Sequence, residues 1–211
     1  MSNIKGGSPG VPSWDERFSA DVYVYGEEAN LFIQETTLFI PPKSKVAAYA
    51  EGEGRNAVFL ARQGHEVTAY DYALTGLRKT EALAAKHGVR VHTAQADLIE
   101  DELPVESYDA AVMVFGHFPR EVQYQVLDKI IGSVKPGGRL LMEVYEEEQI
   151  NCDTGGPREV AWLYSATELL AWCKRQRIKH FFTGEAERTE GLYHSGNCYV
   201  VQVVVEKPAA K

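Results

Sequence analysis

The chain has 211 residues, 45% hydrophobic and 25% charged, a composition typical of a soluble globular protein with a substantial core. It contains 22 Lys and Arg and 30 Asp and Glu, and the resulting net charge of -8 argues against the broad basic face that non-specific nucleic-acid binding needs, although it leaves room for a small local basic patch. Because no apolar run is long enough to cross a bilayer and the first residues lack a signal-peptide core, a cytoplasmic location is expected.

The three cysteines, Cys152, Cys173 and Cys198, lie far apart and without a CxxC motif or clustered histidines. A disulfide framework or a metal site is therefore not expected, and the thiols should be reduced. Residues 1–12 are rich in Gly, Ser and Pro, which predicts a flexible tail ahead of a single domain over residues 13–211.

The first predicted elements after the tail are helical. Ser13 is followed three positions later by Glu16, the pattern of a capping box at a helix start. Residues 27–39 carry apolar side chains at helical spacing, which predicts a second helix. The aromatic residues of this region, among them Trp14 and Tyr25, either pack against the core or form a flap over a ligand.

Residues 45–71 contain a strand, a glycine turn, a helix and a second strand that ends in an acid. This is the order of the βαβ unit that holds an adenosine-containing cofactor. Gly52 and Gly54 let the backbone pass close under a ligand, because a Cβ there would occupy its place. The helix near Glu53 points its free N–H groups at the same spot. Asp71 can accept hydrogen bonds from two ribose hydroxyls.

The rest of the chain alternates helices and strands and ends in two strands. A capping box is expected at Ser165 and Glu168, a strand break at Gly184, and an antiparallel hairpin around the short link over residues 191–197. Helices are predicted over 75–86, 121–134 and 165–174, and strands over 89–94, 108–115, 139–145, 178–189 and 199–206.

This pattern predicts an α/β three-layer sandwich with one antiparallel edge pairing. In open α/β sheets the ligand binds outside the carboxyl ends of the strands. The loops expected to gather there are Glu51–Gly54, Asp71–Tyr72, Asp97–Leu98, Phe115–Pro119 and Tyr145–Pro157.

Residues 52–57 fit G-x-G-x-x-A, so a nicotinamide dinucleotide is one possible cofactor, whereas a P-loop fits poorly because no Lys-Ser/Thr follows the glycines. Three features favour S-adenosylmethionine instead. Asp97 and Leu98 follow the third strand, where a carboxylate can accept from an adenine amino group and a backbone N–H can reach a ring nitrogen. A Lys-Pro-Gly-Gly turn introduces the fifth strand, and the last two strands form a hairpin where a dehydrogenase would continue βαβ.

With these motifs the sequence resembles the class I S-adenosylmethionine-dependent methyltransferases, and more narrowly their bacterial tellurite-resistance and thiopurine-type branch. The resemblance covers nearly the whole chain after Pro12 and implies a Rossmann-like seven-stranded mixed sheet of order 3-2-1-4-5-7-6 with strand 7 antiparallel. The motifs that carry it are Trp14-Asp15-Glu16-Arg17-Phe18, Tyr25-Gly26, residues 50–57, Asp71, Asp97-Leu98, Lys135-Pro136-Gly137-Gly138 and Gly155-Gly156-Pro157.

The resemblance also implies which residues bind the cofactor. Gly52 and Gly54 would pass under its methionine portion, Asp71 would hold the ribose, and Asp97 and Leu98 would frame the adenine. The other cofactor-site candidates lie in the N-terminal flap and in the strand-end loops: Trp14, Tyr25, Asn56, Tyr72 and Phe115.

Two departures from the family pattern lie on the first strand. Ala50 stands where many relatives have the first glycine, and Ala48 stands where many have an acid. Glu51 is the candidate to replace that acid and to contact the cofactor's amino group. If it does not, cofactor affinity would be weak, and a non-catalytic S-adenosylmethionine-binding module is the alternative to an enzyme.

Methyl transfer from a sulfonium is an in-line displacement, so alignment of donor and acceptor carries most of the acceleration. A soft acceptor such as a thiolate, selenium or a tellurium oxyanion needs little general base, whereas an oxygen or nitrogen acceptor could use one. His117 at the end of the fourth strand is a candidate for that base; its structural alternative is loop packing or helix capping. By the resemblance, His194 and Arg188 flank the acceptor pocket, but Glu187-Arg188 stands where tellurite-type relatives carry His-Arg. The expected partner is a small-molecule acceptor, with no nucleic acid or membrane, and the chain would be a monomer or homodimer.

Overall fold

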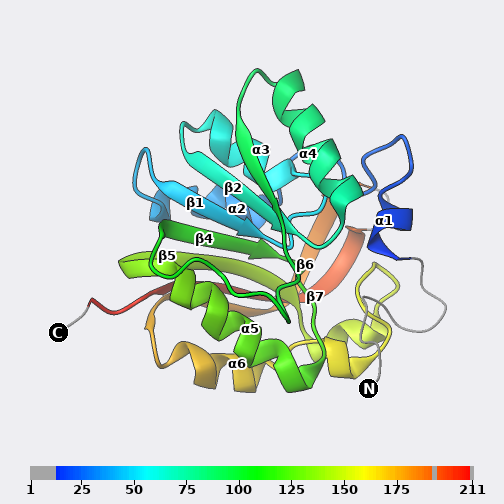
Figure 1. Cartoon of the computed structure of the whole chain (residues 1–211). Helices are drawn as coiled ribbons and strands as arrows, with labels where there is room; N and C mark the ends of the chain where they lie inside the picture. The colour runs from blue at the N-terminus through cyan, green and yellow to red at the C-terminus, as the bar shows by residue number, and fades with distance from the viewer. Residues whose placement is uncertain (1–12, 192–193, 210–211) are drawn as a thin grey trace.

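The computed structural model describes residues 13–191 and 194–209 (Figure 1). The tail predicted over residues 1–12 and residues 192–193 of the hairpin link lie outside the described residues. Among the helices described, none combines the length and the apolar composition that crossing a bilayer requires.

A seven-stranded sheet forms the centre of the molecule, in the order β3-β2-β1-β4-β5-β7-β6. Strands β1 to β5 run parallel to one another, whereas β7 runs antiparallel to both β5 and β6. The predicted fold class and strand order are therefore confirmed. The strands are β1 (Lys45–Tyr49), β2 (Glu66–Asp71), β3 (Val91–Gln95), β4 (Tyr108–Val114), β5 (Val134–Tyr145), β6 (Arg177–Glu190) and β7 (His194–Glu206).

Helices cover both faces of the sheet because each strand exposes apolar side chains on both sides. Helices α2, α3 and α4 pack on one face of the sheet and form one hydrophobic core with it. Helices α5 and α6 pack on the other face and form a second core, as Figure 1 shows. The α-helices are α1 (Trp14–Arg17), α2 (Leu31–Thr36), α3 (Arg55–Arg62), α4 (Leu74–Lys86), α5 (Arg120–Ser133) and α6 (Ala166–Cys173); the 3-10 helices are η1 (Thr37–Phe39), η2 (Glu147–Asn151) and η3 (Val160–Trp162).

The capping predictions have different outcomes. The box at Ser13 and Glu16 is confirmed, with both reciprocal hydrogen bonds present. The box at Ser165 and Glu168 is wrong, because the Ser165 side chain makes no capping hydrogen bond and Glu168 lies 3.9 Å from Arg120 instead. The helix predicted over 27–39 is also too long, since α2 begins only after the N-cap residue Asn30.

Three strand predictions differ from the structure. The last strand, predicted over 199–206, begins already at His194, so that residues 194–197 of the predicted link pair with β6. β5 begins at Val134 and includes the Lys-Pro-Gly-Gly segment, which enters the strand as an irregularity in its pairing with β4 instead of a turn ahead of it. β6 runs through Gly184 without a break, and this residue pairs with Val200. Gly184 has φ +152°, a conformation that a glycine adopts without strain, so the ladder continues through it.

Candidate functional site

The loops after β1, β2 and β3 meet at the carboxyl edge of the sheet, as predicted. The backbone N–H of Gly52 donates to Asp71 Oδ2 at 2.8 Å, and the N–H of Ala73 donates to Asp71 Oδ1 at 2.8 Å. The carbonyl of Asp71 in turn accepts from the N–H of Ala96 at 3.0 Å. The glycine loop and the acid that follows β2 therefore lie on one rim.

Asp71 keeps acceptor capacity for a sugar. A carboxylate offers about four lone pairs, and each Asp71 oxygen is bonded to one backbone N–H, so lone pairs remain for ribose hydroxyls. Burial raises the pKa of Asp71 to about 6, although the N–H groups of Ala73 and Gly52 act against the rise. The acid fits the ribose of an adenosine cofactor.

The two glycines of the loop have different surroundings. Gly52 has φ +63°, and a Cβ there would meet Phe18 Cζ at 3.0 Å. Gly54 has φ +93°, and a Cβ there would lie 2.6 Å from the Thr80 side chain in α4. The structure therefore gives Gly54 a packing role between α3 and α4, while Gly52 faces the N-terminal segment.

That segment, residues 13–30, is called the flap below. The ring of Phe18 covers Gly52, stacks on Trp14 with 5.6 Å between ring centroids, and meets Tyr25 edge-on at 6.2 Å. Asp15 Oδ1 accepts from the N–H of Thr75 at the start of α4, which anchors α1 there. Since Phe18 is buried on the bare backbone, we expect the flap to shift when a cofactor enters.

Glu51 caps a helix. Its Oε1 accepts from the N–H of Ala57 at 2.7 Å, which satisfies a free donor in the first turn of α3. Burial raises the pKa of Glu51 to about 7, against this hydrogen bond and the charge of Arg55. The preceding residue, Ala50, has φ +50°, the left-handed region that a glycine would occupy with less strain. The alanine at this position therefore has a conformational cost.

The adenine-side candidates lie beside the same rim. Asp97 Oδ1 accepts from the N–H of Ile99 at 2.9 Å, which closes a turn around Leu98, a buried residue. Tyr72 is 42% exposed, and its carbonyl accepts from Gln95 Nε2 at 3.0 Å. These positions lie at the edge of the rim formed by β2 and β3, and their role in binding the adenine stays a prediction.

Asn56 and Arg188 lie in a buried polar cluster. Asn56 Oδ1 accepts from the N–H of Asn30 at 2.9 Å, so this side chain holds the start of α2. The guanidinium of Arg188 forms a two-pronged ion pair with Glu143, whose side chain is fully buried in β5. Arg188 is therefore engaged by a carboxylate within the fold. We assign it no role with an anionic acceptor.

Arg55 and Glu190 also belong to this cluster, and neither they nor Glu143 were predicted from the sequence as site residues. They form an ion pair with 2.7 Å between Arg55 Nη1 and Glu190 Oε2, and both side chains are buried. Glu190 also accepts from Asn30 Nδ2 at 3.0 Å and from the N–H of Leu31 at 3.2 Å. One signal was available in the sequence, since Glu143 is a lone acid in an apolar strand and such a residue needs a buried partner.

His117 is tied to the backbone through both ring nitrogens. Its Nε2 accepts from the N–H of Tyr145 at 3.3 Å, so its proton is on Nδ1 and is donated to the Trp162 carbonyl at 2.9 Å. Loss of water contact lowers the pKa of His117 to about 4. A ring with neither nitrogen available fits the loop-packing alternative better than a base.

His194 lies at the centre of an aromatic cluster, the His194 cluster, formed with Tyr25, Phe115 and Tyr145. Its ring centroid is 4.5 Å from that of Tyr25, 4.4 Å from Phe115 and 5.7 Å from Tyr145. Among the residues that the structure describes, His194 Nδ1 and Tyr145 Oη are buried and have no hydrogen-bond partner. Burial, together with the charge of Arg55, holds the pKa of His194 well below its usual value, so the imidazole is neutral.

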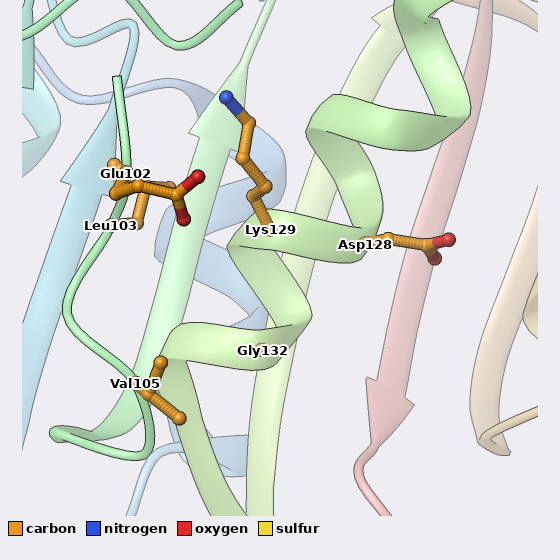
Figure 2. Close-up of a pocket in the computed structure, with 6 residues that line it drawn as sticks. All are labelled: Glu102, Leu103, Val105, Asp128, Lys129 and Gly132. Atoms are coloured by element: carbon orange, nitrogen blue, oxygen red, sulfur yellow. The ribbon is translucent and has the colours of Figure 1, made fainter. Parts of the chain in front are cut away.

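A cavity of about 300 Å³ lies away from these residues, between the loop before β4 and the last turns of α5 (Figure 2). Leu103 and Val105 line it from the loop, and Lys129 lines it from the helix. Lys129 Nζ donates to the carbonyls of Ile99 and Asp101. None of the residues that line this cavity belongs to the strand-end loops named above, so it is separate from the site that those loops form.

Comparison with known proteins agrees with this geometry. Residues 46–138 match a family model described as a methyltransferase domain. No curated protein matches the sequence significantly.

Solved structures share the fold at low sequence identity. A S-adenosylmethionine-dependent methyltransferase from Methanosarcina mazei has a TM-score of 0.68 at 15% identity, over 87% of this chain and 100% of that one. TehB from Haemophilus influenzae has a TM-score of 0.69 at 19% identity, over 92% and 67%. The [4+2]-cyclase SpnF has a TM-score of 0.67 at 13% identity, over 90% and 88%. Residues 46–138 thus match a methyltransferase domain, and the fold of the chain is that of solved S-adenosylmethionine-dependent methyltransferases.

Proposed function

We propose that the protein transfers a methyl group from S-adenosylmethionine to a small, uncharged acceptor held at the His194 cluster, with His194 as the proton acceptor. The observation that carries this proposal is a pair of buried polar atoms in the cluster, His194 Nδ1 and Tyr145 Oη, that have no partner within the described part of the chain. Buried polar atoms normally have partners, and an exception at a strand-end site points to a ligand. The cofactor, when bound, supplies an electrophilic methyl group on its sulfonium.

The chain's own residues position the reactants. Asp71 and the bare backbone of Gly52 would hold the cofactor at the rim, and Phe115, which follows β4, packs edge-on against His194 with 4.4 Å between ring centroids. His194 Nδ1, which has no hydrogen-bond partner among the described residues, can take the proton that an O–H or N–H nucleophile loses. His117 would fix the loop around Tyr145 and move no proton, because both of its nitrogens are bonded.

An uncharged acceptor fits better than an oxyanion such as tellurite. Arg188, the cation that the resemblance places beside the acceptor, is bound by Glu143 and lies 3.7 Å from Glu190. The aromatic rings of the cluster bring no charge, and burial raises the pKa of Tyr145 above its usual value, so its phenol stays neutral. Apolar rings favour a planar or aliphatic neutral molecule over a hydrated anion.

The test is methyl transfer from radiolabelled S-adenosylmethionine to a panel of neutral and anionic small molecules. The wild type is expected to label neutral O–H or N–H acceptors, and His194→Ala is expected to lose about 100-fold or more in kcat. His92→Ala is the matched control, because His92 is exposed on β3. Equal rates for His194→Ala and the wild type would remove His194 from the reaction.

A second candidate is a module that binds S-adenosylmethionine without turnover. Ala48, the strained Ala50 and the closed packing of Phe18 on Gly52 favour it. Tight binding of S-adenosylhomocysteine, with no transfer across the whole panel, would select this candidate over the enzyme.

A further inference from the structure

Two of the three cysteines, distant in sequence, line one small cavity. Cys152 follows η2 in the loop after β5 and is half-buried, whereas Cys198 is buried in β7. The cavity measures about 60 Å³ and is lined by Cys152, Glu185, Asn197, Cys198 and Tyr199.

Hydrogen bonds on both sides hold the two cysteines opposite each other. Ahead of Cys152, the side chain of Gln149 accepts from the N–H of Tyr199 at 2.7 Å. Beyond Cys152, Thr154 Oγ1 donates to the carbonyl of Asn197 at 2.7 Å. On the loop, Cys152 lies between the two anchor residues Gln149 and Thr154. On β7, Cys198 lies between the anchor residues Asn197 and Tyr199, so its Cα is about 3.8 Å from the Cα of each.

The two thiols also share a buried environment. Cys198 packs in a core with Tyr145, Leu163 and Val200, against which Ile150 of η2 packs. Burial raises the pKa of Cys198 to about 12, and Cys152 is among the weaker groups that add to the rise. The loop that carries Cys152 thus covers the face of β7 into which Cys198 points.

We propose that Cys152 and Cys198 are a redox modification site, which low-molecular-weight disulfides convert to an intramolecular disulfide. The Cys152 thiolate attacks one sulfur of oxidised glutathione, and a glutathione thiolate leaves. The Cys198 thiolate then attacks Cys152 Sγ and releases a second glutathione thiolate. The protein loses two protons and two electrons, and the oxidised glutathione is reduced to two thiols. The proposal is independent of the proposed function.

The oxidised form would join the loop after β5 to β7. Cys198 and Tyr145 belong to the same buried core, so the bond would form beside the His194 cluster. The order of events follows from exposure. Cys152 reacts first because it is the more accessible thiol, and the buried Cys198 completes the bond more slowly.

The experiment treats the full chain with oxidised glutathione at mildly alkaline pH, blocks the remaining thiols under denaturing conditions, and identifies unreduced peptides by mass spectrometry. We expect two of the three thiols to be lost and a peptide to appear that joins Cys152 to Cys198 and lacks two hydrogens. Cys173→Ser is the matched control, since Cys173 lies in the separate core under α6, and it should form the same product.

Cys198→Ser should stop at a glutathione adduct on Cys152. If this buried substitution unfolds the chain, Cys152→Ser in the loop gives the complementary result, with no glutathione taken up by the folded protein. An adduct on Cys152 that persists in the wild type while Cys198 remains alkylatable would overturn the proposal, as would a crosslink through Cys173.

Discussion

Arg55 and Glu190 form a buried ion pair that joins the first turn of α3 to the tip of the terminal hairpin, with 2.7 Å between Arg55 Nη1 and Glu190 Oε2. Arg55 Nη1 also donates to the carbonyl of Tyr25 at 3.1 Å. The flap, the helix behind the glycine loop and the strand next to His194 therefore meet at one guanidinium. This contact links the cofactor side of the site to the acceptor side.

Removal of one partner of this pair should be strongly destabilising. Arg55→Ala leaves the Glu190 carboxylate buried without its main counter-ion, and we expect a loss of about 3–5 kcal/mol in the free energy of unfolding, measured with urea. Arg158→Ala is the control, because Arg158 and its partner Asp153 are both exposed, and a change within about 0.5 kcal/mol is expected. Similar losses in both variants would show that the buried ion pair contributes no more to the free energy of unfolding than the exposed one.

The surroundings of Gly54 and Gly64 predict that an alanine at Gly54 destabilises the fold more than an alanine at Gly64. Gly54→Ala combines a left-handed φ with a Cβ that meets Thr80, whereas Gly64→Ala has φ +90° and open space around the new Cβ. Both should lose about 1–2 kcal/mol of stability from strain, and Gly54→Ala about 1–3 kcal/mol more from overpacking. Thermal and urea unfolding measure the two losses. Equal losses would contradict the packing role of Gly54.

Glu51 predicts a pH dependence of stability. A glutamate ordinarily titrates near pH 4.5, and the pKa of Glu51 is raised to about 7 in the fold, so between these values the folded chain binds more protons than the unfolded chain. Stability therefore falls as the pH rises through this window, by about 3 kcal/mol from this group.

The matched variant is Glu51→Gln, which keeps an acceptor oxygen for the N–H of Ala57 but does not titrate. Urea unfolding at about pH 5 and about pH 8 should show a smaller loss in the variant than in the wild type. Asp71 contributes in the same direction in both proteins, so the difference belongs to Glu51. Identical slopes would mean that the carboxylate is not buried as described.

If Asp71 binds the ribose of the cofactor, its substitution should weaken the binding of S-adenosylhomocysteine, the product of methyl transfer. Asp71→Asn removes the charge and replaces one acceptor oxygen with an N–H donor, so the ribose hydroxyls lose a charged partner. We expect binding of S-adenosylhomocysteine to weaken by about 10- to 100-fold, equivalent to about 1.5–3 kcal/mol, measured by calorimetry. Asp153→Asn, at a fully exposed position, serves as the control. Unchanged affinity in Asp71→Asn would place the ribose elsewhere.

Local patterns in the sequence predicted most of the fold. Alternating apolar runs and helical spacings located the strands and most helices, because a buried parallel strand needs apolar side chains on both faces. The capping box at Ser13 was predictable since both of its hydrogen bonds lie within one turn. The box at Ser165 failed because Glu168 is placed near Arg120, a residue far away in the chain.

The site was predicted in part, and the division has a physical reason. The sequence by itself determined the rim that joins Gly52 and Asp71, since the order strand, turn, helix, strand brings the ends of neighbouring parallel strands together. Only the tertiary structure decided that both nitrogens of His117 are bonded, that Arg188 pairs with Glu143, and that one nitrogen of His194 has no partner in residues 13–191 and 194–209. Those outcomes depend on contacts between residues far apart in the chain, which spacing along the sequence does not encode.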